Sequence, residues 1–306
     1  MSLIAYFGPQ GTFTEQAALR VIDPATDELV PVETVPAALA AVRSGTVDAA
    51  CVPVENSVEG AVTMTMDSLA DGDPLVAVAE VVLPVAFSIL VRPGTKPQDV
   101  ATVASIPIAL AQVRGWLAEN LPQAEHRFTN STSASAVAVL NGEFDAAVTA
   151  PVAASHYALE VLSTGVADIT DAKTRFLLLR RPGSLPEPTG ADRTSLIVFT
   201  DDRTGALSDV LVELAQRGIN LSRIESRPTK GRLGEYRFFL DFDGHVAEAR
   251  VGDALAALRR RCMSVRFLGS FPKADGIASV VQTGNEDADF AQAQQWLDKV
   301  RAGQAG

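Results

Sequence analysis

The segment Lys173-Thr174-Arg175-Phe176 places a hydroxyl, a guanidinium and an aromatic ring next to one another in the chain. A guanidinium binds a carboxylate through two parallel hydrogen bonds, and a threonine hydroxyl both donates and accepts hydrogen bonds. The segment also precedes the apolar run 177–179, as the solvated start of an ordinary edge strand would. The residues by themselves leave two interpretations open: a strand end, or a site for an anionic ligand.

Three further segments offer hydroxyl and amide groups where helices are predicted to begin. Thr12 and Glu15 follow the first predicted strand with the spacing of a capping box. Asn56 and Ser57 precede a helix predicted from about residue 60, and Ser131-Thr132-Ser133 precedes another. Each group would most simply cap its own helix, but together at one cleft they would form a site for a small anion.

The elements that must position these groups follow an α/β pattern. Short apolar runs alternate with alanine-rich stretches of helical length through about the first 70 residues. Beyond them, strands are predicted at 75–82 and 85–91, separated at Pro84, and helices at 107–120, 134–141 and 151–162.

Two stretches of this region resemble each other. Residues 33–50 and 130–147 each contain a hydroxyl cap, an alanine-rich helix, a glycine stop and an Asp-Ala-Ala strand. Any two capped helix-to-strand segments of an alanine-rich chain would look alike, so the similarity leaves two possibilities. Either it is incidental, or the region consists of two similar α/β lobes that face each other across a ligand-binding cleft.

The composition excludes several classes of protein. Of the 306 residues, 47% are apolar, which is too many for a disordered chain, and 37 acidic against 26 basic side chains give a net charge of −11. A surface that follows nucleic-acid phosphates has little to be built from, so we expect no nucleic-acid partner. The N-terminus has no basic segment before a long apolar one, and no segment reaches about 18 uncharged apolar residues. We expect a cytoplasmic protein with no membrane span.

Cysteine and histidine give no sign of a metal site. Cys51 and Cys262 are far apart in the chain, in segments predicted to be a buried strand and a helix end. His126, His156 and His245 have no metal-ligand spacing with one another or with a cysteine. We therefore expect two unreactive thiols and no bound metal.

The chain divides near residue 181. Residues 1–180 contain 9 basic and 20 acidic side chains, whereas residues 181–306 contain 17 of each. The predicted domains are 1–180, a linker rich in proline and glycine at 181–193, a second domain at 194–272 and a tail at 273–306.

The second domain has the pattern of a ferredoxin-like sandwich. Its predicted order is βαββαβ, with strands at 194–200, 219–227, 235–242 and 265–271 and helices at 205–217 and 246–262. In the tail, a helix is predicted around 286–301. It carries Phe290, Trp296, Leu297 and Val300 roughly on one side, so we expect it to pack on the body or on a neighbour.

Several motifs occur in the order and rough spacing of the prephenate dehydratases. They are Gly8-Pro-Gln-Gly-Thr-Phe13, Pro53-Val-Glu-Asn-Ser57, Ser131-Thr-Ser-Ala134 and Thr174-Arg-Phe176. The following residues resemble an ACT regulatory domain, with Gly205-Ala-Leu-Ser208 and Glu225-Ser-Arg-Pro228 as in its phenylalanine-binding version. The resemblance covers about residues 3–272. It implies a catalytic domain of two lobes like a type II periplasmic binding protein, with the active site between them.

The resemblance also implies an activity and the residues that perform it. Prephenate would become phenylpyruvate, water and CO₂, and because aromatisation drives this hydro-lyase reaction, no cofactor is needed. Thr174 would donate a hydrogen bond to the departing hydroxyl, Arg175 would pair with a carboxylate, and Phe176 would form a wall that positions the ring. Further donors to the substrate would be Thr12, Asn56, Ser57, Thr132 and Ser133. Glu55 and the histidines stay open as alternatives for the general acid.

For the ACT domain, the resemblance implies that L-phenylalanine binds between paired domains and inhibits. The pocket would be formed by Gly205, Ala206, Leu207, Ser208, Asn220, Glu225, Ser226, Arg227 and Pro228. Without the resemblance, Glu225 and Arg227 would be interpreted as a surface charge pair on an edge strand. Binding across subunits implies a homodimer or homotetramer.

Two other functions fit the same motifs. An arogenate dehydratase performs the same chemistry on a substrate with an amino group in place of the side-chain ketone. A non-catalytic amino-acid sensor would combine the same two folds without turnover, although the intact Thr174-Arg175-Phe176 argues against it. Because the first predicted strand begins at Leu3, we expect a monofunctional enzyme without the chorismate mutase module that some relatives carry in front.

Overall fold

The computed structural model describes residues 1–229, 231 and 234–304, which form two compact units. The first unit consists of Met1–Ser68 and Val81–Arg180, and the second consists of Leu69–Glu80 and the chain from Arg181 onward. In the part of the chain described, no helix combines the length and the apolar character that crossing a membrane requires.

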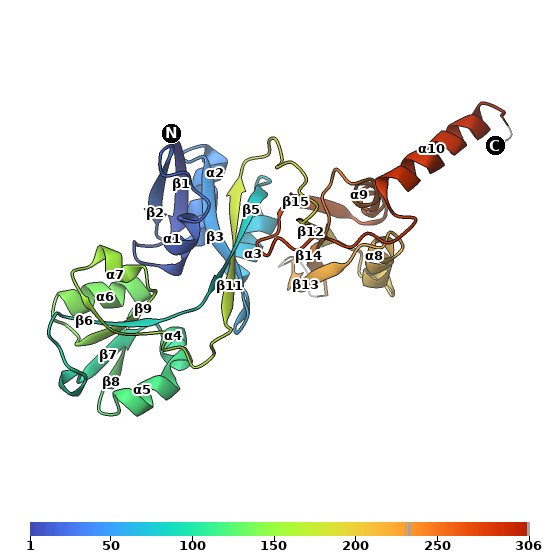
Figure 1. The fold of residues 1–306 in the computed structure, drawn as a ribbon. Coiled ribbons are helices and arrows are strands. Elements are labelled where there is room, and N and C mark those ends of the chain that lie inside the picture. The colour runs from blue at the N-terminus through green and yellow to red at the C-terminus, as the bar shows by residue number, and fades with distance from the viewer. Residues whose placement is uncertain (230, 232–233, 305–306) are drawn as a thin grey trace. The chain divides into compact units, whose positions relative to one another are not determined.

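The first lobe of the first unit is built on a sheet with the strand order β2-β1-β3-β11-β5, in which β4 also pairs with β3 (Figure 1). Its strands are β1 (Ser2–Phe7), β2 (Asp27–Val32), β3 (Ala49–Asn56), β4 (Gly60–Ala61), β5 (Val76–Pro84) and β11 (Lys173–Arg180), and its helices are α1 (Phe13–Ala18), α2 (Val35–Ser44) and α3 (Thr63–Ala70). β1 pairs in parallel with β2 and β3, whereas β11 runs antiparallel to β3. This pairing brings the end of β3 beside the start of β11.

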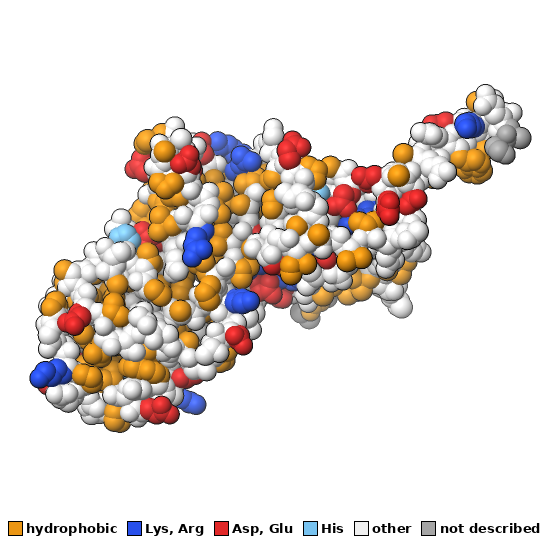
Figure 2. All heavy atoms as spheres, viewed as in Figure 1, with side chains coloured by type: hydrophobic (Ala, Val, Ile, Leu, Met, Phe, Trp, Pro, Cys, Tyr) orange, Lys and Arg blue, Asp and Glu red, His pale blue; other side chains and the backbone are white. Residues whose placement is uncertain are grey.

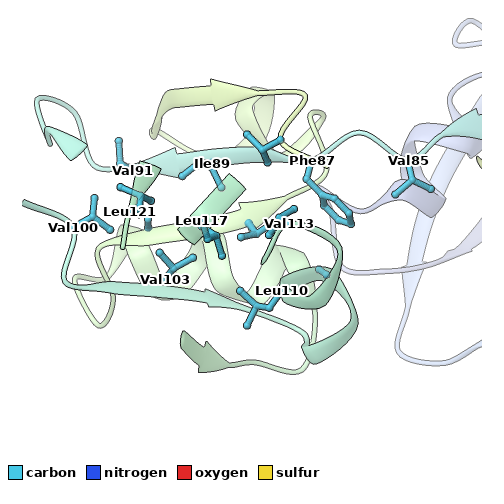
Figure 3. Close-up of a cluster of buried hydrophobic side chains, with 14 of the residues drawn as sticks. Val85, Phe87, Ile89, Val91, Val100, Val103, Leu110, Val113, Leu117 and Leu121 are labelled. Carbon is cyan, nitrogen blue, oxygen red and sulfur yellow. The ribbon is translucent and has the colours of Figure 1, made fainter. Parts of the chain in front are cut away.

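The second lobe has a five-stranded sheet in the order β10-β6-β9-β7-β8. Its elements are β6 (Ser88–Val91), the 3₁₀ helix η1 (Pro97–Asp99), β7 (Thr102–Ser105), α4 (Pro107–Gln112), α5 (Arg114–Asn120), β8 (Glu125–Phe128), α6 (Thr132–Leu140), β9 (Ala146–Thr149), α7 (Ala153–His156) and β10 (Glu160–Thr164). A cluster of buried side chains packs the sheet against α4 and α5; Figure 3 shows Ile89, Val103, Leu110 and Leu117 within it. Each such side chain contributes about 1.5–3 kcal/mol by its burial.

The two similar stretches are confirmed as capped helices followed by strands, one in each lobe. Thr34 accepts a hydrogen bond from Ala37 N at the start of α2, and Gly45 ends that helix with φ 79°. Ser131 accepts one from Ala134 N at the start of α6. The strands that follow, β3 and β9, are central in their sheets and are buried where they begin.

Two of the helices predicted for the second lobe differ from the observed ones. The predicted helix at 107–120 is divided into α4 and α5 at Val113, whose ψ of 12° leaves the helical range. The predicted helix at 151–162 is wrong over its second half. Residue Tyr157 adopts an extended conformation after the short α7, and 160–164 form β10, which pairs antiparallel with β6. Strand pairing here overrides local helix preference.

The second unit contains the predicted βαββαβ sandwich. Its elements are β12 (Asp192–Phe199), α8 (Ala206–Ala215), β13 (Leu221–Pro228), β14 (Tyr236–Asp243), α9 (Ala249–Arg261), β15 (Ser264–Pro272) and a further helix, α10 (Asp287–Arg301). The strand order is β13-β14-β12-β15, with antiparallel neighbours throughout. Apolar residues of α8, α9 and the sheet form one core.

Leu69–Glu80 packs with the second unit, although the sequence places it inside a continuous domain 1–180. Arg237 Nη1 lies 3.0 Å from Asp71 Oδ1, and the buried Glu80 is paired with Arg193. The close approach of Gly269 to the backbone of Ala77 leaves no room for a Cβ there. Because β5 begins in this segment and continues through Val81–Pro84, one strand belongs to both units.

Candidate active site

A cavity of about 570 Å³ lies within the first unit and is lined by residues of both lobes. This volume is within the usual range for small-molecule pockets, about 300–1,000 Å³. The polar residues at its lining are Thr12, Thr14, Glu33, Asn56 and Thr174 in the first lobe and Gln112, Asn130, Ser131 and Thr132 in the second. The predicted grouping of these segments at one cleft is therefore observed for five of their side chains: Thr12, Asn56, Ser131, Thr132 and Thr174.

Thr174 and Asn56 are directly opposite in the β3–β11 pair, and Asn56 Nδ2 donates a hydrogen bond of 2.9 Å to Thr174 Oγ1. The orientation of the amide is fixed, because Asn56 Oδ1 accepts from the backbone N–H groups of Val58 and Glu59 at 2.8 and 3.1 Å. Since Thr174 Oγ1 accepts from Asn56, its own hydroxyl proton is the one that can be donated to a ligand.

Arg175 and Phe176 do not line this cavity. The Arg175 side chain is buried, with Nη1 3.9 Å from Glu55 Oε2, as expected when successive strand residues face opposite sides. The register shift at this point adds a residue to β3, where Val54 lies between the partners of Arg175 and Phe176, so Phe176 keeps its place in the alternation of β11. Phe176 is 1% exposed, in a hydrophobic cluster against which Phe13 packs.

The aromatic walls of the cavity come from other positions. Phe13 and Phe87, one from each lobe, meet edge to face with ring centroids 5.4 Å apart. The prediction that Phe176 forms a wall therefore does not match its position, because Phe13 stands between that cluster and the cavity. Of the motif Thr174-Arg175-Phe176, only Thr174 therefore lines the cavity.

The loop between β1 and α1 is fixed by both lobes. Thr12 caps α1 and accepts from Glu15 N at 3.3 Å, which is the first half of the predicted capping box. The Glu15 carboxylate accepts from Gly11 N at 2.6 Å and lies 3.0 Å from His156 Nε2. Burial raises the pKa of the Tyr6 hydroxyl, and the negative charge of the neighbouring Glu15 raises it further. Glu15 therefore holds the loop that lines one side of the cavity.

Ser133 and Ser57 hold the site together from outside the cavity lining. Ser133 is fully buried and donates its hydroxyl hydrogen bond to Gln10 O, so that α6 of the second lobe contacts the loop of the first. Ser57 Oγ accepts from Lys173 N at 2.8 Å, which ties the end of β3 to the start of β11. Both were predicted as substrate donors; in the structure their hydroxyls contact the backbone.

Sequence reasoning missed Gln112 and Asn130. Gln112 is 8% exposed at the end of α4 and lines the cavity, yet its segment offers no motif that would identify it. Asn130 directly precedes the Ser-Thr-Ser segment and could have been included with it. Glu33 also lines the cavity, and the described lining residues include no lysine or arginine. Neutral donors therefore dominate the lining.

The candidate effector residues lie on two elements of the second unit. Gly205 has φ 83° and is the N-cap of α8, whose first residues are Ala206, Leu207 and Ser208. Glu225, Ser226, Arg227 and Pro228 lie on β13, which is an edge of the sheet. Asn220 donates to Asp243 Oδ2 at 3.0 Å. The left-handed conformation at residue 205 explains why glycine is present there.

Comparison with known proteins gives both parts of the chain a family. A family model described as prephenate dehydratase matches residues 4–184, and one described as ACT domain matches residues 194–260. A protein of Amycolatopsis methanolica named prephenate dehydratase is 62% identical over 305 residues, which is 99% of each chain.

Solved structures show the same similarity. The prephenate dehydratase of Arthrobacter aurescens in complex with L-Phe superimposes with a TM-score of 0.93 at 44% identity and covers 98% of this chain and 99% of its own. A protein described as a quorum quenching acylase, GqqA, has a TM-score of 0.79 at 30% identity, covering 88% and 97%. The fold is thus shared with a protein of another described activity, to which the identity is lower than to the dehydratases of Amycolatopsis methanolica and Arthrobacter aurescens. The chain belongs to the prephenate dehydratase family and carries a C-terminal ACT domain.

Proposed function

We propose that this protein converts prephenate to phenylpyruvate, water and CO₂ and that L-phenylalanine regulates it through the ACT domain. The observation that carries the proposal is the Thr174 hydroxyl, which Asn56 holds at a cavity lined by both lobes. Membership of the family supports it, with 62% identity to a named prephenate dehydratase along nearly the whole chain.

The reaction needs little from the protein beyond a hydrogen-bond donor and a shaped cavity. When the bond from the ring to its carboxylate breaks, the electron pair enters the ring and CO₂ departs. The ring carbon that bears the hydroxyl loses hydroxide with its bonding electrons, and a proton converts that hydroxide to water. The aromatic ring of phenylpyruvate results. The barrier falls most if a donor stabilises the charge that develops on the departing oxygen.

Thr174 is the donor in this proposal. A threonine hydroxyl is a weak acid, so it acts by hydrogen bonding to the departing oxygen or by relaying a proton to it. The Asn56 amide polarises the hydroxyl by donating to its oxygen at 2.9 Å. General acid catalysis of this kind typically contributes a factor of about 10²–10⁴ in rate.

The two carboxylates of prephenate would be held by neutral donors and by the start of α6. Ser131 and Thr132 open that nine-residue helix, and the Gln112 amide lies at the same cavity. Each charge-assisted hydrogen bond contributes about 1.5–3 kcal/mol. Arg175 is the proposed further partner of one of these carboxylates. Because its buried guanidinium does not line the cavity, binding through it requires a side-chain rearrangement toward the cavity.

The ring would lie between apolar side chains. Phe13 and Phe87 form an edge-to-face pair at the cavity, and Val85 and Ile106 add aliphatic surface. These walls exclude water from the departing hydroxide and hold the ring in one orientation. Phe176 supports Phe13 from behind in the buried cluster of the first lobe.

Regulation would use the ACT domain. The relative from Arthrobacter aurescens was solved with L-Phe, which supports L-phenylalanine as the effector here. We place its pocket at the start of α8 and along β13 of paired domains, in a homodimer or homotetramer. Inhibition requires a coupling free energy of only about 1–3 kcal/mol between two conformations.

The test is to measure phenylpyruvate formation by the full chain with prephenate, with arogenate, and with prephenate plus L-phenylalanine. The proposal expects turnover of prephenate, a lower kcat/KM for arogenate, and inhibition by L-phenylalanine. Preference for arogenate would identify an arogenate dehydratase. Binding of phenylalanine without any turnover would show a sensor and contradict the proposal.

A further inference from the structure

Helix α10 carries an apolar stripe of which no member is buried in the described chain: Phe290 and Leu297 are partly exposed, and Val300 is exposed. None of its residues is buried, and Trp296 and Val300 are 56% and 44% exposed. Its first turn is attached to the second unit, where Asp287 Oδ1 accepts from Ala249 N at 2.7 Å. From there α10 extends away from α9 (Figure 1), with hydrophobic and charged side chains exposed along it (Figure 2).

The stripe has the spacing of one side of a two-helix pair. Phe290, Ala293, Leu297 and Val300 follow one another at intervals of three, four and three residues. These intervals are those of the a and d positions of a heptad, where helices meet in a coiled coil. Trp296 flanks the stripe next to Leu297. A stripe so regular, with none of its members buried in the described chain, has the form of an interface.

We propose that α10 pairs antiparallel with α10 of a second copy of this chain. In that alignment Phe290 lies opposite Val300 of the second copy, and Ala293 lies opposite Leu297. Each facing pair then joins a larger side chain to a smaller one, so the two helices can pack at an even distance along the stripe. The two Trp296 rings lie near the centre and cover the same side of the pair.

The charge distribution favours this orientation. Acidic residues, Asp287 and Asp289, occupy the first turn of α10, and basic ones, Lys299 and Arg301, occupy the last. This arrangement also suits the dipole of a single helix, so it does not by itself indicate pairing. Between two copies, however, it is self-complementary only when the helices run antiparallel, because a parallel pair would place acid beside acid and base beside base.

The size of the stripe defines its role. About ten residues of helix span roughly 15 Å, so a pair of such helices buries less than the 1,200–2,000 Å² or so of a standard interface. The α10 pair therefore acts together with another contact between copies. It is separate from the pairing of ACT domains proposed above, and α10 supplies no residue to the catalytic cavity.

The test compares Leu297→Glu with Gln295→Glu in the full chain. Both substitutions add one negative charge to the same helix, but Gln295 lies on the side opposite the stripe. We expect sedimentation equilibrium to show that Leu297→Glu weakens self-association by about tenfold or more. At a protein concentration at which the wild type is associated, the average mass of the Leu297→Glu protein should then be about half that of the wild type. Gln295→Glu should match the wild type. A wild-type chain that stays monomeric, or equal masses for all three proteins, would overturn the proposal.

The orientation is tested with the double substitution Lys299→Gln and Arg301→Gln. Antiparallel helices lose an attraction, so self-association weakens, whereas parallel helices lose a repulsion and self-association strengthens. Strengthening would therefore contradict the antiparallel pair even if Leu297→Glu reduces the mass.

Prephenate turnover should be measured on the same samples. Because α10 is outside the catalytic cavity, Leu297→Glu should keep the wild-type turnover per chain. Absence of turnover in every sample, with the predicted masses, would reject the proposed function and leave the α10 pair standing. Wild-type turnover with equal masses for all the proteins would reject the α10 pair and leave the proposed function standing.

Discussion

Asn56 Nδ2 donates to Thr174 Oγ1 at 2.9 Å across two antiparallel strands, at the wall of the cavity between the two lobes of the first unit. The contact joins residues 118 positions apart in the chain. It leaves the hydroxyl proton of Thr174 as the group that can be offered to a substrate, and the amide of Asn56 cannot rotate without losing two backbone hydrogen bonds. In the proposed reaction, the donor strength of Thr174 therefore depends on Asn56.

Replacing Asn56 should reduce kcat while the fold persists. Asn56→Ala removes the donor to Thr174 and the acceptor for Val58 and Glu59, so we expect a loss of about tenfold or more in kcat. Steady-state kinetics with prephenate checks this, and circular dichroism monitors the fold. Asn141→Ala, at the C-terminal end of α6, is a control and should leave kcat unchanged. Unchanged kcat for Asn56→Ala would show that the amide does not assist Thr174.

A methyl group at Gly11 should disturb the cavity. Gly11 has φ 82°, and a Cβ there would lie 2.6 Å from Ser133 Oγ and 3.2 Å from Ala153 Cα. Gly11→Ala must therefore shift the loop against the second lobe, and we expect a raised KM and a lower Tm. Gly94→Ala is the matched control, because Gly94 has φ 81° and open space around it. Equal effects of the two substitutions would mean that only backbone strain matters.

Asp145 should make stability depend on pH. Its burial opposes ionisation, but hydrogen bonds from Thr102, Ala101 and Arg92 outweigh that effect and lower its pKa. Because the folded pKa is the lower one, the ionised carboxylate stabilises the protein above the unfolded value of about 3.9, and this contribution is lost as the pH falls through the folded value.

Asp145→Asn should therefore lower the free energy of unfolding at pH 7, by about 1–3 kcal/mol from the loss of charge-assisted hydrogen bonds. The difference from the wild type should shrink as the pH is lowered below about 4. Urea unfolding across this pH range measures it. Glu143→Gln, at an exposed position two residues away, should show no such trend. A constant difference for Asp145→Asn at all pH values would contradict the account.

The proposed effector pocket is tested by Ser208→Ala and Arg227→Ala. Either change should raise the concentration of L-phenylalanine that gives half inhibition by about tenfold, while kcat without effector stays near the wild-type value. Isothermal titration with L-phenylalanine should show the same loss in affinity. Inhibition that is unchanged in both variants would place the pocket elsewhere.

Local signals in the sequence were sufficient where one segment determines its own conformation. The caps at Thr34 and Ser131 predicted the starts of α2 and α6, and the glycine at 45 predicted the stop of α2, because they satisfy backbone groups within the same turn. The spacing of apolar residues and the order of the predicted strands and helices were likewise enough to predict the βαββαβ sandwich of the second unit.

The remaining features depend on contacts between distant segments. Phe176 is in the core because Phe13 packs against its cluster, and no residue type in its own segment indicates that contact. The strand at 160–164 forms because β6 is available to pair with it. Leu69–Glu80 joins the second unit through partners such as Arg193 and Arg237, which are more than a hundred residues away. Gln112 becomes a cavity residue only when α4 is placed against the other lobe.

The most direct test of the account is the rate of phenylpyruvate formation from prephenate by the wild type, Thr174→Ala and Thr174→Ser. The account predicts that Thr174→Ala lowers kcat by about 10² or more while the protein stays folded, and that Thr174→Ser, which keeps a hydroxyl, retains most of the rate. Near-normal turnover by a folded Thr174→Ala protein would contradict it, because the donor to the departing hydroxyl would then be another group.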